Sequence, residues 1–228
     1  MENRKHTSLK DLAQALGVSI PTVSRALKDS PEISRELCAK AKALAKEMNY
    51  RPNPFAMSLR KNAPRIIGVI VPDIVTHFFA SILNGIENMA IANGYFVIIT
   101  TSHESYEHEK RNIENLVNMR VEGIIACLSQ ETTDFSHISA LKDINMPLIL
   151  FDRVCLTDQF SSVIADGAQS AQIATQHLLD NGSKRVAFIG GANHLDIVKR
   201  RKHGYLEALR ENRIPIEKEL VVCRKIDY

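Results

Sequence analysis

The sequence predicts two structures in one chain: a small helical headpiece of the helix-turn-helix type, and after it a doubly wound parallel α/β core. Three observations predict this. Residues 8–27 have the apolar periodicity of two helices that meet at a glycine. From residue 65 onward, short apolar runs alternate with amphipathic segments. Basic charge is concentrated in the residues before position 65. We expect a headpiece over 1–50, a hinge helix and linker over 51–64, one lobe of the core over 65–165, and part of a second lobe over 166–228.

The segment from Ser8 to Leu16 has the pattern of a capped amphipathic helix. Ser8 and Asp11 have the spacing of a capping box, in which each side chain bonds the other residue's amide. Gly17 follows as a residue that adopts positive φ at a helix end. One face carries Leu9, Leu12, Ala13 and Leu16. We therefore expect a helix and then a tight corner.

A second helix is expected directly after this corner. Ser19 suits its N-cap, and Pro21 is tolerated in the first turn because amides there have no intrahelical partner. Val23 and Leu27 should face inward. A helix N-terminus attracts phosphate and an arginine fork matches guanine, so this helix is a candidate for DNA reading, with an ordinary helical hairpin as the alternative. The residues expected to point outward are Ile20, Pro21, Thr22, Ser24, Arg25 and Lys28.

Two more helices are expected before the composition changes. The segment from Ser34 to Met48 is amphipathic and closes a three-helix domain. Asn53 and Pro54 have the signature of an N-cap followed by proline at the first helical position, and this helix would run to Arg60. It is too short to be stable alone in water, so it should fold only against a partner.

The charge distribution divides the chain at the same place. Residues 1–64 hold 12 Lys and Arg against 6 Asp and Glu, a net charge of +6, whereas the remaining residues hold 17 against 20, a net charge of −3. A basic segment attached to an acidic one is typical of a protein that neutralises DNA phosphates with one domain. We expect DNA binding that weakens steeply with salt.

From residue 65 the pattern changes to alternating strands and helices. The expected strands are short, β-branched and free of alternation, which is typical of strands buried on both faces; they cover 66–71, 95–99, 123–128, 147–151, 186–190 and 220–223. The expected helices cover 78–93, 106–119, 136–143, 168–181 and 199–212. This order predicts a parallel sheet with right-handed crossovers, and a ligand crevice beyond the carboxyl ends of the strands.

These residues resemble the lactose-repressor (LacI/GalR) family of bacterial transcription regulators. The motifs that carry the resemblance match in order and spacing: Asp11-Leu-Ala, Gly17-Val-Ser, Thr22-Val-Ser-Arg25-Ala-Leu, Asn49-Tyr50-Arg-Pro-Asn53, Ala56 and Leu59. The resemblance implies that Ile20, Pro21 and Arg25 read base edges and that Ser19, Thr22 and Ser24 contact phosphate or backbone. Asn53, Ala56 and Leu59 then belong to the hinge, where Leu59 wedges into the central step of a palindrome. A leucine of a small dimer core is the alternative for Leu59.

The resemblance extends over the core and implies a two-lobed sugar-binding fold with a small effector between the lobes. Arg201, three residues before Gly204, matches a family arginine that reaches the ligand, and Asp152 matches a carboxylate that faces the same cleft. A carboxylate, an arginine and an aromatic ring suit a polyol. The expected effector residues are Asp73, His77, Phe78, Phe79, Ser129, Asp152 and Arg201. Alternatively, Asp152 pairs with Arg153 and the phenylalanines belong to the core.

The chain departs from the family pattern at its end. It stops at Tyr228, just after the expected strand 220–223, whereas family members continue and complete both lobes. We therefore expect a C-terminally truncated member of the family.

Other classes of protein have little support. No apolar run of membrane-spanning length and no signal peptide is present, which favours a cytoplasmic protein. No catalytic constellation and no cofactor motif appears, and the four cysteines have no Cys-x-x-Cys pair, so we expect no metal, disulfide or cofactor. The patch His103, Glu104, Glu107, His108 and Glu109 is interpreted as a solvated helix start.

The sequence thus predicts a homodimeric, sequence-specific repressor that binds palindromic double-stranded DNA and responds to a small effector, expected to be a sugar. It is not expected to be an enzyme. Two alternatives stay open: a sugar-binding protein or sugar-processing enzyme whose headpiece serves only assembly, and an architectural DNA binder without sequence preference.

Overall fold

The computed structural model describes residues 7–50 and 65–224. The expected hinge helix, and with it Asn53, Ala56 and Leu59, lies outside the described residues. The chain divides into two compact units, Met1–Asn62 and Ala63–Tyr228. The finer division into headpiece, hinge and two lobes stays a prediction.

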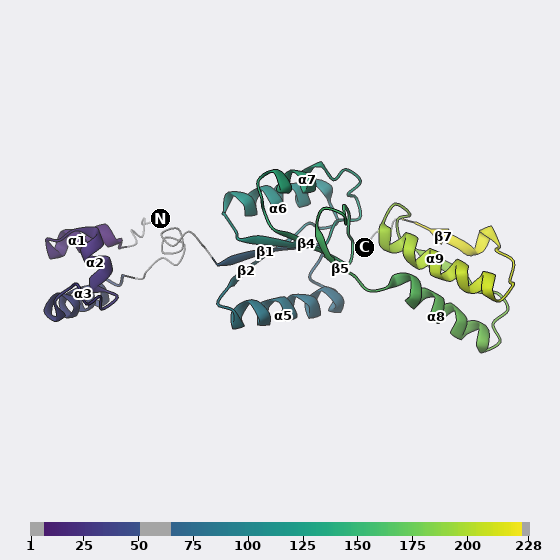
Figure 1. Ribbon diagram of the computed structural model, residues 1–228, viewed down its shortest axis with the longest axis horizontal. Coiled ribbons are helices and arrows are strands. Elements are labelled where there is room, and N and C mark those ends of the chain that lie inside the picture. The colour runs from purple at the N-terminus through teal and green to yellow at the C-terminus, as the bar shows by residue number, and fades with distance from the viewer. Residues whose placement is uncertain (1–6, 51–64, 225–228) are drawn as a thin grey trace. The chain divides into compact units, whose positions relative to one another are not determined.

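The described part of the first unit, residues 7–50, contains three helices: α1 (Leu9–Leu16), α2 (Ile20–Ala26) and α3 (Arg35–Glu47) (Figure 1). The capping box is confirmed, because the Asp11 carboxylate accepts from the Ser8 amide at 2.8 Å and the Ser8 hydroxyl accepts from the Asp11 amide at 3.3 Å. Gly17 ends α1 with φ 64°, and Ser19 caps α2 through the Thr22 amide. The fully buried side chains that hold the helices together are Leu12, Val23, Ala26 and Ala41.

The second unit begins with a five-stranded sheet of β1 (Ile66–Val71), β2 (Phe96–Thr101), β3 (Gly123–Ala126), β4 (Leu148–Phe151) and β5 (Ser161–Val163). All neighbours are parallel, in the order β2-β1-β3-β4-β5. From β1 the chain runs to β2 on one side of it and then to β3 on its other side, so the topological switch point lies between β1 and β3. The doubly wound fold is confirmed.

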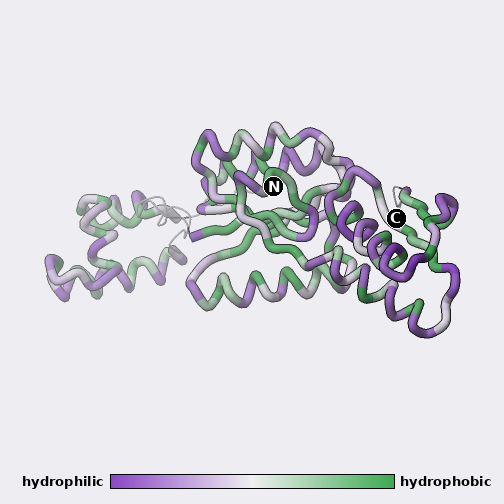
Figure 2. Tube along the Cα trace, turned by 45° about the vertical axis from the view of Figure 1, so that its right-hand side comes forward, coloured by the Kyte–Doolittle hydropathy of each residue, from purple (hydrophilic) through white to green (hydrophobic). Residues whose placement is uncertain are grey.

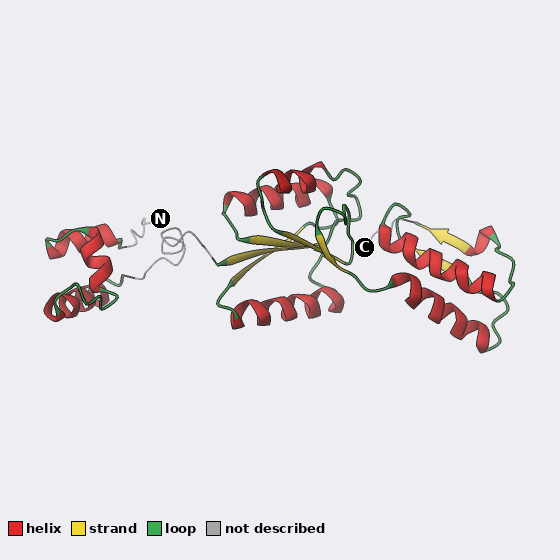
Figure 3. Cartoon of the chain, viewed as in Figure 1, coloured by secondary structure: helices red, strands yellow, loops and turns green. Residues whose placement is uncertain are grey.

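Helices cover both faces of this sheet (Figures 1 and 3). On one face, α5 (His77–Ala92) packs Phe79 and Leu83 against Val69 and Val71 of β1. On the other face, α6 (Tyr106–Asn118) and α7 (Ser136–Asp143) contribute Ile113, Leu116, Ile138 and Leu141 to the larger core cluster. Figure 2 shows the hydrophobic residues concentrated along the strands between these helices. Burial from both sides explains why the apolar run of β1 lacks alternation.

The rest of the second unit contains α8 (Gly167–Asp180), β6 (Phe188–Gly190), α9 (Asp196–Glu211), a short 3₁₀ helix (Lys218–Leu220) and β7 (Val221–Cys223). β6 and β7 form a parallel pair. Tyr205 of α9 is buried and donates its hydroxyl to the Val186 carbonyl at 2.9 Å. At Gly204, α9 approaches α8 so closely that an added Cβ would lie 1.9 Å from the Ala168 carbonyl oxygen.

The strand predictions were wrong in three respects. The run 186–190 was expected to be buried on both faces, but Ile189 in β6 is 83% exposed. β5 was not expected, because Ser-Ser-Val carries no apolar run and is exposed along its length. β2 was expected to be buried on both faces, but it is an edge strand, with Phe96 64% exposed and Ile99 44% exposed. β2 pairs with β1 on one side only, and at this margin of the sheet several of its side chains are left uncovered.

Candidate nucleic-acid interface and effector site

The exposed side of α2 carries most of the residues expected to contact DNA. Ser19, Ile20, Pro21 and Arg25 are exposed and Thr22 is half-buried. Ser24, however, is 9% exposed, so the expectation that it points outward is wrong. The exposed surface of α2 is therefore narrower than the sequence predicted.

Arg25 is held by an acidic neighbour that sequence reasoning missed. Its Nη1 lies 2.9 Å from Oε2 of Glu32, a residue of the loop between α2 and α3, and both side chains are largely exposed. Exposed ion pairs contribute little to stability, so this pair costs little free energy to break. Glu32 lies seven residues from Arg25 in sequence, a spacing that no helical rule connects.

The residues after β1 are only partly available to a ligand. The Asp73 carboxylate accepts from the amides of Ile74 and Val75, at 2.6 and 3.0 Å, and so shapes its own turn. His77 and Phe78 are exposed, and Phe78 packs edge to face on Phe79. Phe79 itself is 7% exposed and belongs to the core with Phe151. An effector contact by Phe79 is therefore hindered by its burial.

The loop after β3 is fixed by a buried carboxylate. Glu109 of α6 has no exposed surface and accepts from the Ser129 amide, the Thr132 hydroxyl and His137 Nε2, at 2.5, 2.9 and 2.8 Å. Ser129 is itself fully buried, and its hydroxyl accepts from the Glu131 amide. Ser129 therefore shapes the loop, and its burial keeps its side chain from the surface where an effector was expected.

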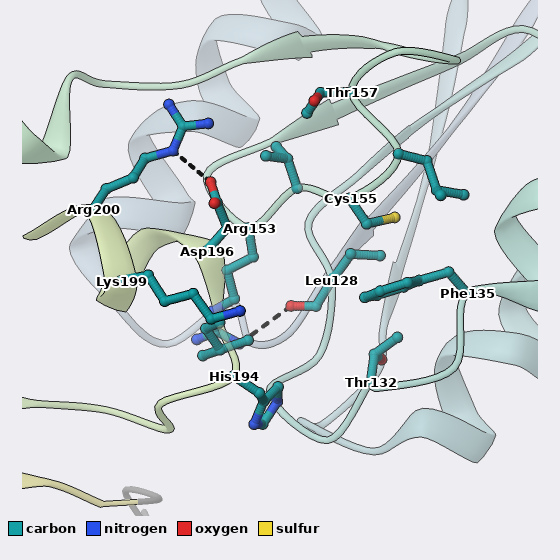
Figure 4. Close-up of a pocket in the computed structure, with 13 residues that line it drawn as sticks. Leu128, Thr132, Phe135, Arg153, Cys155, Thr157, His194, Asp196, Lys199 and Arg200 are labelled. Carbon is teal, nitrogen blue, oxygen red and sulfur yellow. Dashed lines mark hydrogen bonds and ion pairs between the residues drawn. The ribbon is translucent and has the colours of Figure 1, made fainter.

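A second carboxylate ties the loops after β2, β3 and β4 together. Glu104 forms a two-pronged ion pair with Arg153, at 2.6 and 2.9 Å, and accepts from the Gln130 amide at 2.7 Å. Arg153 also donates to the Leu128 carbonyl (Figure 4). The alternative in which Arg153 pairs with Asp152 is therefore wrong, and so is the interpretation of Glu104 and Glu109 as a solvated helix start. Glu104 and Arg153 are 49 positions apart, and no pattern in the sequence indicates that they form an ion pair.

The charge of Arg201 acts on the carboxyl group of Asp152. Asp152 follows β4 with a left-handed backbone, φ 58°. Burial raises the pKa of its carboxyl, while the charges of Arg153 and Arg201 oppose that rise. A partly buried carboxylate close to arginine side chains is typical of a binding site. Arg201 is exposed and lies against Gly167 at the start of α8, where its Cγ would be 3.3 Å from an added Cβ.

The Asp152→Asn variant is expected to be more stable than the parent chain at neutral pH. In the folded chain the pKa of the Asp152 carboxyl lies above its ordinary value of 3.8, so ionisation of this carboxyl destabilises the fold. The stability that the protonated carboxyl contributes at low pH is therefore lost as the pH rises through the folded-state pKa. Asparagine removes this loss and tolerates the left-handed backbone. Urea unfolding of both chains at several pH values measures the difference, which should shrink in acid. A variant less stable than the parent at neutral pH would contradict this assignment.

Two family models match the chain. The one described as bacterial regulatory proteins, lacI family, matches residues 8–53, and the one described as periplasmic binding proteins and sugar binding domain of LacI family matches residues 65–227. The chain belongs to the LacI family. The two matches coincide with the helical headpiece and the α/β core, so the predicted resemblance is confirmed over both units.

Individual LacI-family proteins are similar over most of this chain. Catabolite control protein A of Priestia megaterium is 32% identical over 222 residues, which cover 95% of this chain and 65% of that protein. The ribose operon repressor of Bacillus subtilis (strain 168) is 31% identical, covering 92% and 62%. The crystal structure of the lac repressor dimer bound to operator and the anti-inducer ONPF has a TM-score of 0.74 at 25% identity, covering 96% and 66%. The chain thus spans less than two thirds of the length of each.

Among residues 7–50 and 65–224, no three His, Cys, Asp or Glu side chains gather as metal ligands would, and no helix has the length and apolarity needed to cross a membrane. All four cysteines are free. Burial raises the pKa of the Cys127 thiol and of the Cys155 thiol to about 12, so both stay protonated at neutral pH.

Proposed function

We propose that this protein is a transcriptional repressor of the LacI type that binds palindromic operator DNA as a homodimer. The observation that carries the proposal is α2, a capped helix whose exposed side presents Ile20, Pro21 and Arg25 while Val23 and Ala26 anchor it in the headpiece. The match of the headpiece to the LacI regulatory model supports the same function. A reading helix fixed by its buried side can enter a major groove without rearrangement.

The site for an effector is proposed at the carboxyl ends of β1 and β4. Asp73, His77, Phe78, Asp152 and Arg201 are the candidates whose side chains are at least partly exposed. Sugar hydroxyls would donate to Asp152 and accept from Arg201, and Phe78 offers a ring face. The match of the core to the sugar-binding domain model supports a sugar. An effector that binds one arrangement of the lobes more tightly would change DNA affinity, with a coupling of typically 1–3 kcal/mol.

The Arg25→Ala variant tests the reading helix. Selection of bound duplexes from a randomised pool at moderate salt should enrich a palindrome with the parent chain. The variant is expected to lose base preference at one position in each half-site, at a cost of about 1–3 kcal/mol. Arg35→Ala removes the same charge from the exposed start of α3 and serves as the control, since it should weaken binding to all sequences evenly.

Any other outcome of this selection experiment would favour a different function for the chain. Unchanged base preference in the Arg25→Ala chain would contradict the assignment of α2. Salt-sensitive binding of the parent without enrichment of any sequence would indicate an architectural DNA binder. No DNA binding at all, with a sugar bound, would favour a sugar-binding protein or sugar-processing enzyme whose headpiece serves assembly.

A further inference from the structure

A carboxylate lies directly beside the arginine that is expected to read DNA. Oε2 of Glu32 accepts from Nη1 of Arg25 at 2.9 Å, and both side chains are more than half exposed. A guanidinium carries several N–H donors in a rigid fork, and Glu32 uses only Nη1. The donors that remain include the two that a guanine edge requires. Arg25 can therefore keep Glu32 as a partner while it contacts a base.

The loop between α2 and α3 fixes the place of Glu32 relative to Arg25. The Ser30 amide donates to the backbone carbonyl of Arg25 itself at 3.1 Å, and the Ile33 amide donates to the Ser30 carbonyl at 3.0 Å. Ile33, the residue after Glu32, packs against the part of the headpiece core that contains Ala26. Contacts that involve neither side chain of the ion pair thus place Glu32 next to Arg25.

The start of the same loop is fixed by a second ion pair. Asp29 has a left-handed backbone, with φ 52°, and its carboxylate accepts from Nζ of Lys42 in α3 at 2.6 Å. A residue other than glycine adopts this backbone only where its surroundings hold it. The loop that carries Glu32 therefore joins α2 to α3 in one defined turn.

The ion pair changes what Arg25 contributes to DNA binding. An unpaired arginine is attracted to every phosphate, and this attraction does not depend on sequence. A carboxylate beside the guanidinium offsets part of that attraction, while the N–H donors that recognise a base edge are retained. A long side chain that is already oriented also loses less conformational entropy on binding. Glu32 therefore favours base contacts by Arg25 over phosphate contacts.

We propose that Glu32 is a positioning residue that makes Arg25 selective for guanine. Its carboxylate orients the guanidinium and weakens the attraction of Arg25 to phosphates, so Arg25 contributes more to base discrimination than to general affinity. This inference rests on the proposed function, in which α2 reads base edges. Because exposed ion pairs contribute little to stability, a substitution of Glu32 should leave the fold of the headpiece unchanged.

Titration of the chain with two duplexes tests the proposal. One is the palindrome that the parent chain selects, and the other differs only at the base pair of each half-site whose preference is lost in the Arg25→Ala chain. The ratio of the two Kd values measures discrimination. Glu32→Gln removes the charge but keeps the length of the side chain. We expect it to lower this ratio about threefold or more and to tighten binding to the altered duplex about twofold. An unchanged ratio would overturn the proposal.

Glu36→Gln is the matched control. Glu36 also forms an exposed ion pair in the headpiece, with Lys40 of α3, so its substitution removes the same charge. Binding to both duplexes should tighten by the same factor, and the ratio should stay at the parent value. An equal fall of the ratio in the Glu36 and Glu32 variants would mean that any headpiece carboxylate has this effect, which contradicts a specific role for Glu32. Circular dichroism of both variants should match that of the parent chain.

The Arg25→Ala background separates positioning from a direct contact. If Glu32 acts through Arg25, adding Glu32→Gln to the Arg25→Ala chain should not change the ratio further. A further change would mean that Glu32 itself contacts a base, which contradicts positioning. Unchanged base preference in the Arg25→Ala chain would contradict the proposed reading helix together with this inference. Loss of preference in the Arg25→Ala chain and its retention in the Glu32→Gln chain would contradict this inference alone.

Discussion

The Gly204→Ala chain is expected to lose the packing of α8 against α9. The new Cβ would lie 1.9 Å from the Ala168 carbonyl oxygen and 3.0 Å from the Gln172 amide nitrogen, and both are backbone atoms that no rotamer change can move. The helices must separate, which uncovers Tyr205, Ala208 and Leu209. We expect a loss of at least about 3 kcal/mol in the stability of this pair. Hydrogen exchange of the α8 and α9 amides measures it directly.

Gly85→Ala in α5 is the matched control for this prediction. An added Cβ there meets no atom within 4 Å, and Gly85 also lies inside a helix. The same substitution should therefore stabilise the chain by about 0.5–1 kcal/mol through helix propensity alone. If exchange of the α8 and α9 amides were equally slow in both variants and the parent, the close approach at Gly204 would be refuted.

The Glu109→Gln chain is expected to lose about 3 kcal/mol of stability, although the two side chains have nearly the same shape. Both carboxylate oxygens of Glu109 accept hydrogen bonds, and the three donors come from Ser129, Thr132 and His137. A glutamine would turn its NH₂ group toward at least one of these donors. Since the site is fully buried, no water compensates for the lost bond. Urea unfolding followed by circular dichroism measures the loss.

Glu107→Gln serves as the control for the Glu109 prediction. Glu107 lies in the same first turn of α6 and is exposed, so its substitution should change stability by less than about 0.5 kcal/mol. Similar effects of the two substitutions would show that the Glu109 cluster contributes only through helix electrostatics. A loss confined to Glu109 would show that it fixes the loop after β3.

Much of the fold could be predicted from the sequence because local rules determine it. The Ser8 capping box, the positive φ of Gly17 and the N-cap at Ser19 depend on residues no more than a few positions apart. The β1 and α7 boundaries agree with prediction, and most others differ by one to three residues. β5 was missed because its pairing with β4, and not its composition, makes it a strand.

The contacts around the candidate effector site were harder to predict, because they join residues that are far apart in the sequence. Glu104 and Glu109 appear in sequence as part of a charged helix start, and only the fold brings Arg153, Ser129 and His137 to them. The burial of Ser24 was missed for a similar reason, since the sequence around a polar residue on a short helix does not indicate that its side chain is buried. The roles of the residues proposed to contact DNA and effector therefore remain predictions.

The seven-residue length of α2 has a consequence for how such proteins diversify. In the proposed function, structural and recognition roles fall on different residues of this helix: Val23, Ser24 and Ala26 are buried, whereas Ile20, Pro21 and Arg25 are exposed. Exposed positions can change with small effects on folding, because surface substitutions usually alter stability by less than about 0.5 kcal/mol. Gene duplication followed by a few exposed substitutions would then give paralogues that recognise separate operators in one cell while keeping a common scaffold.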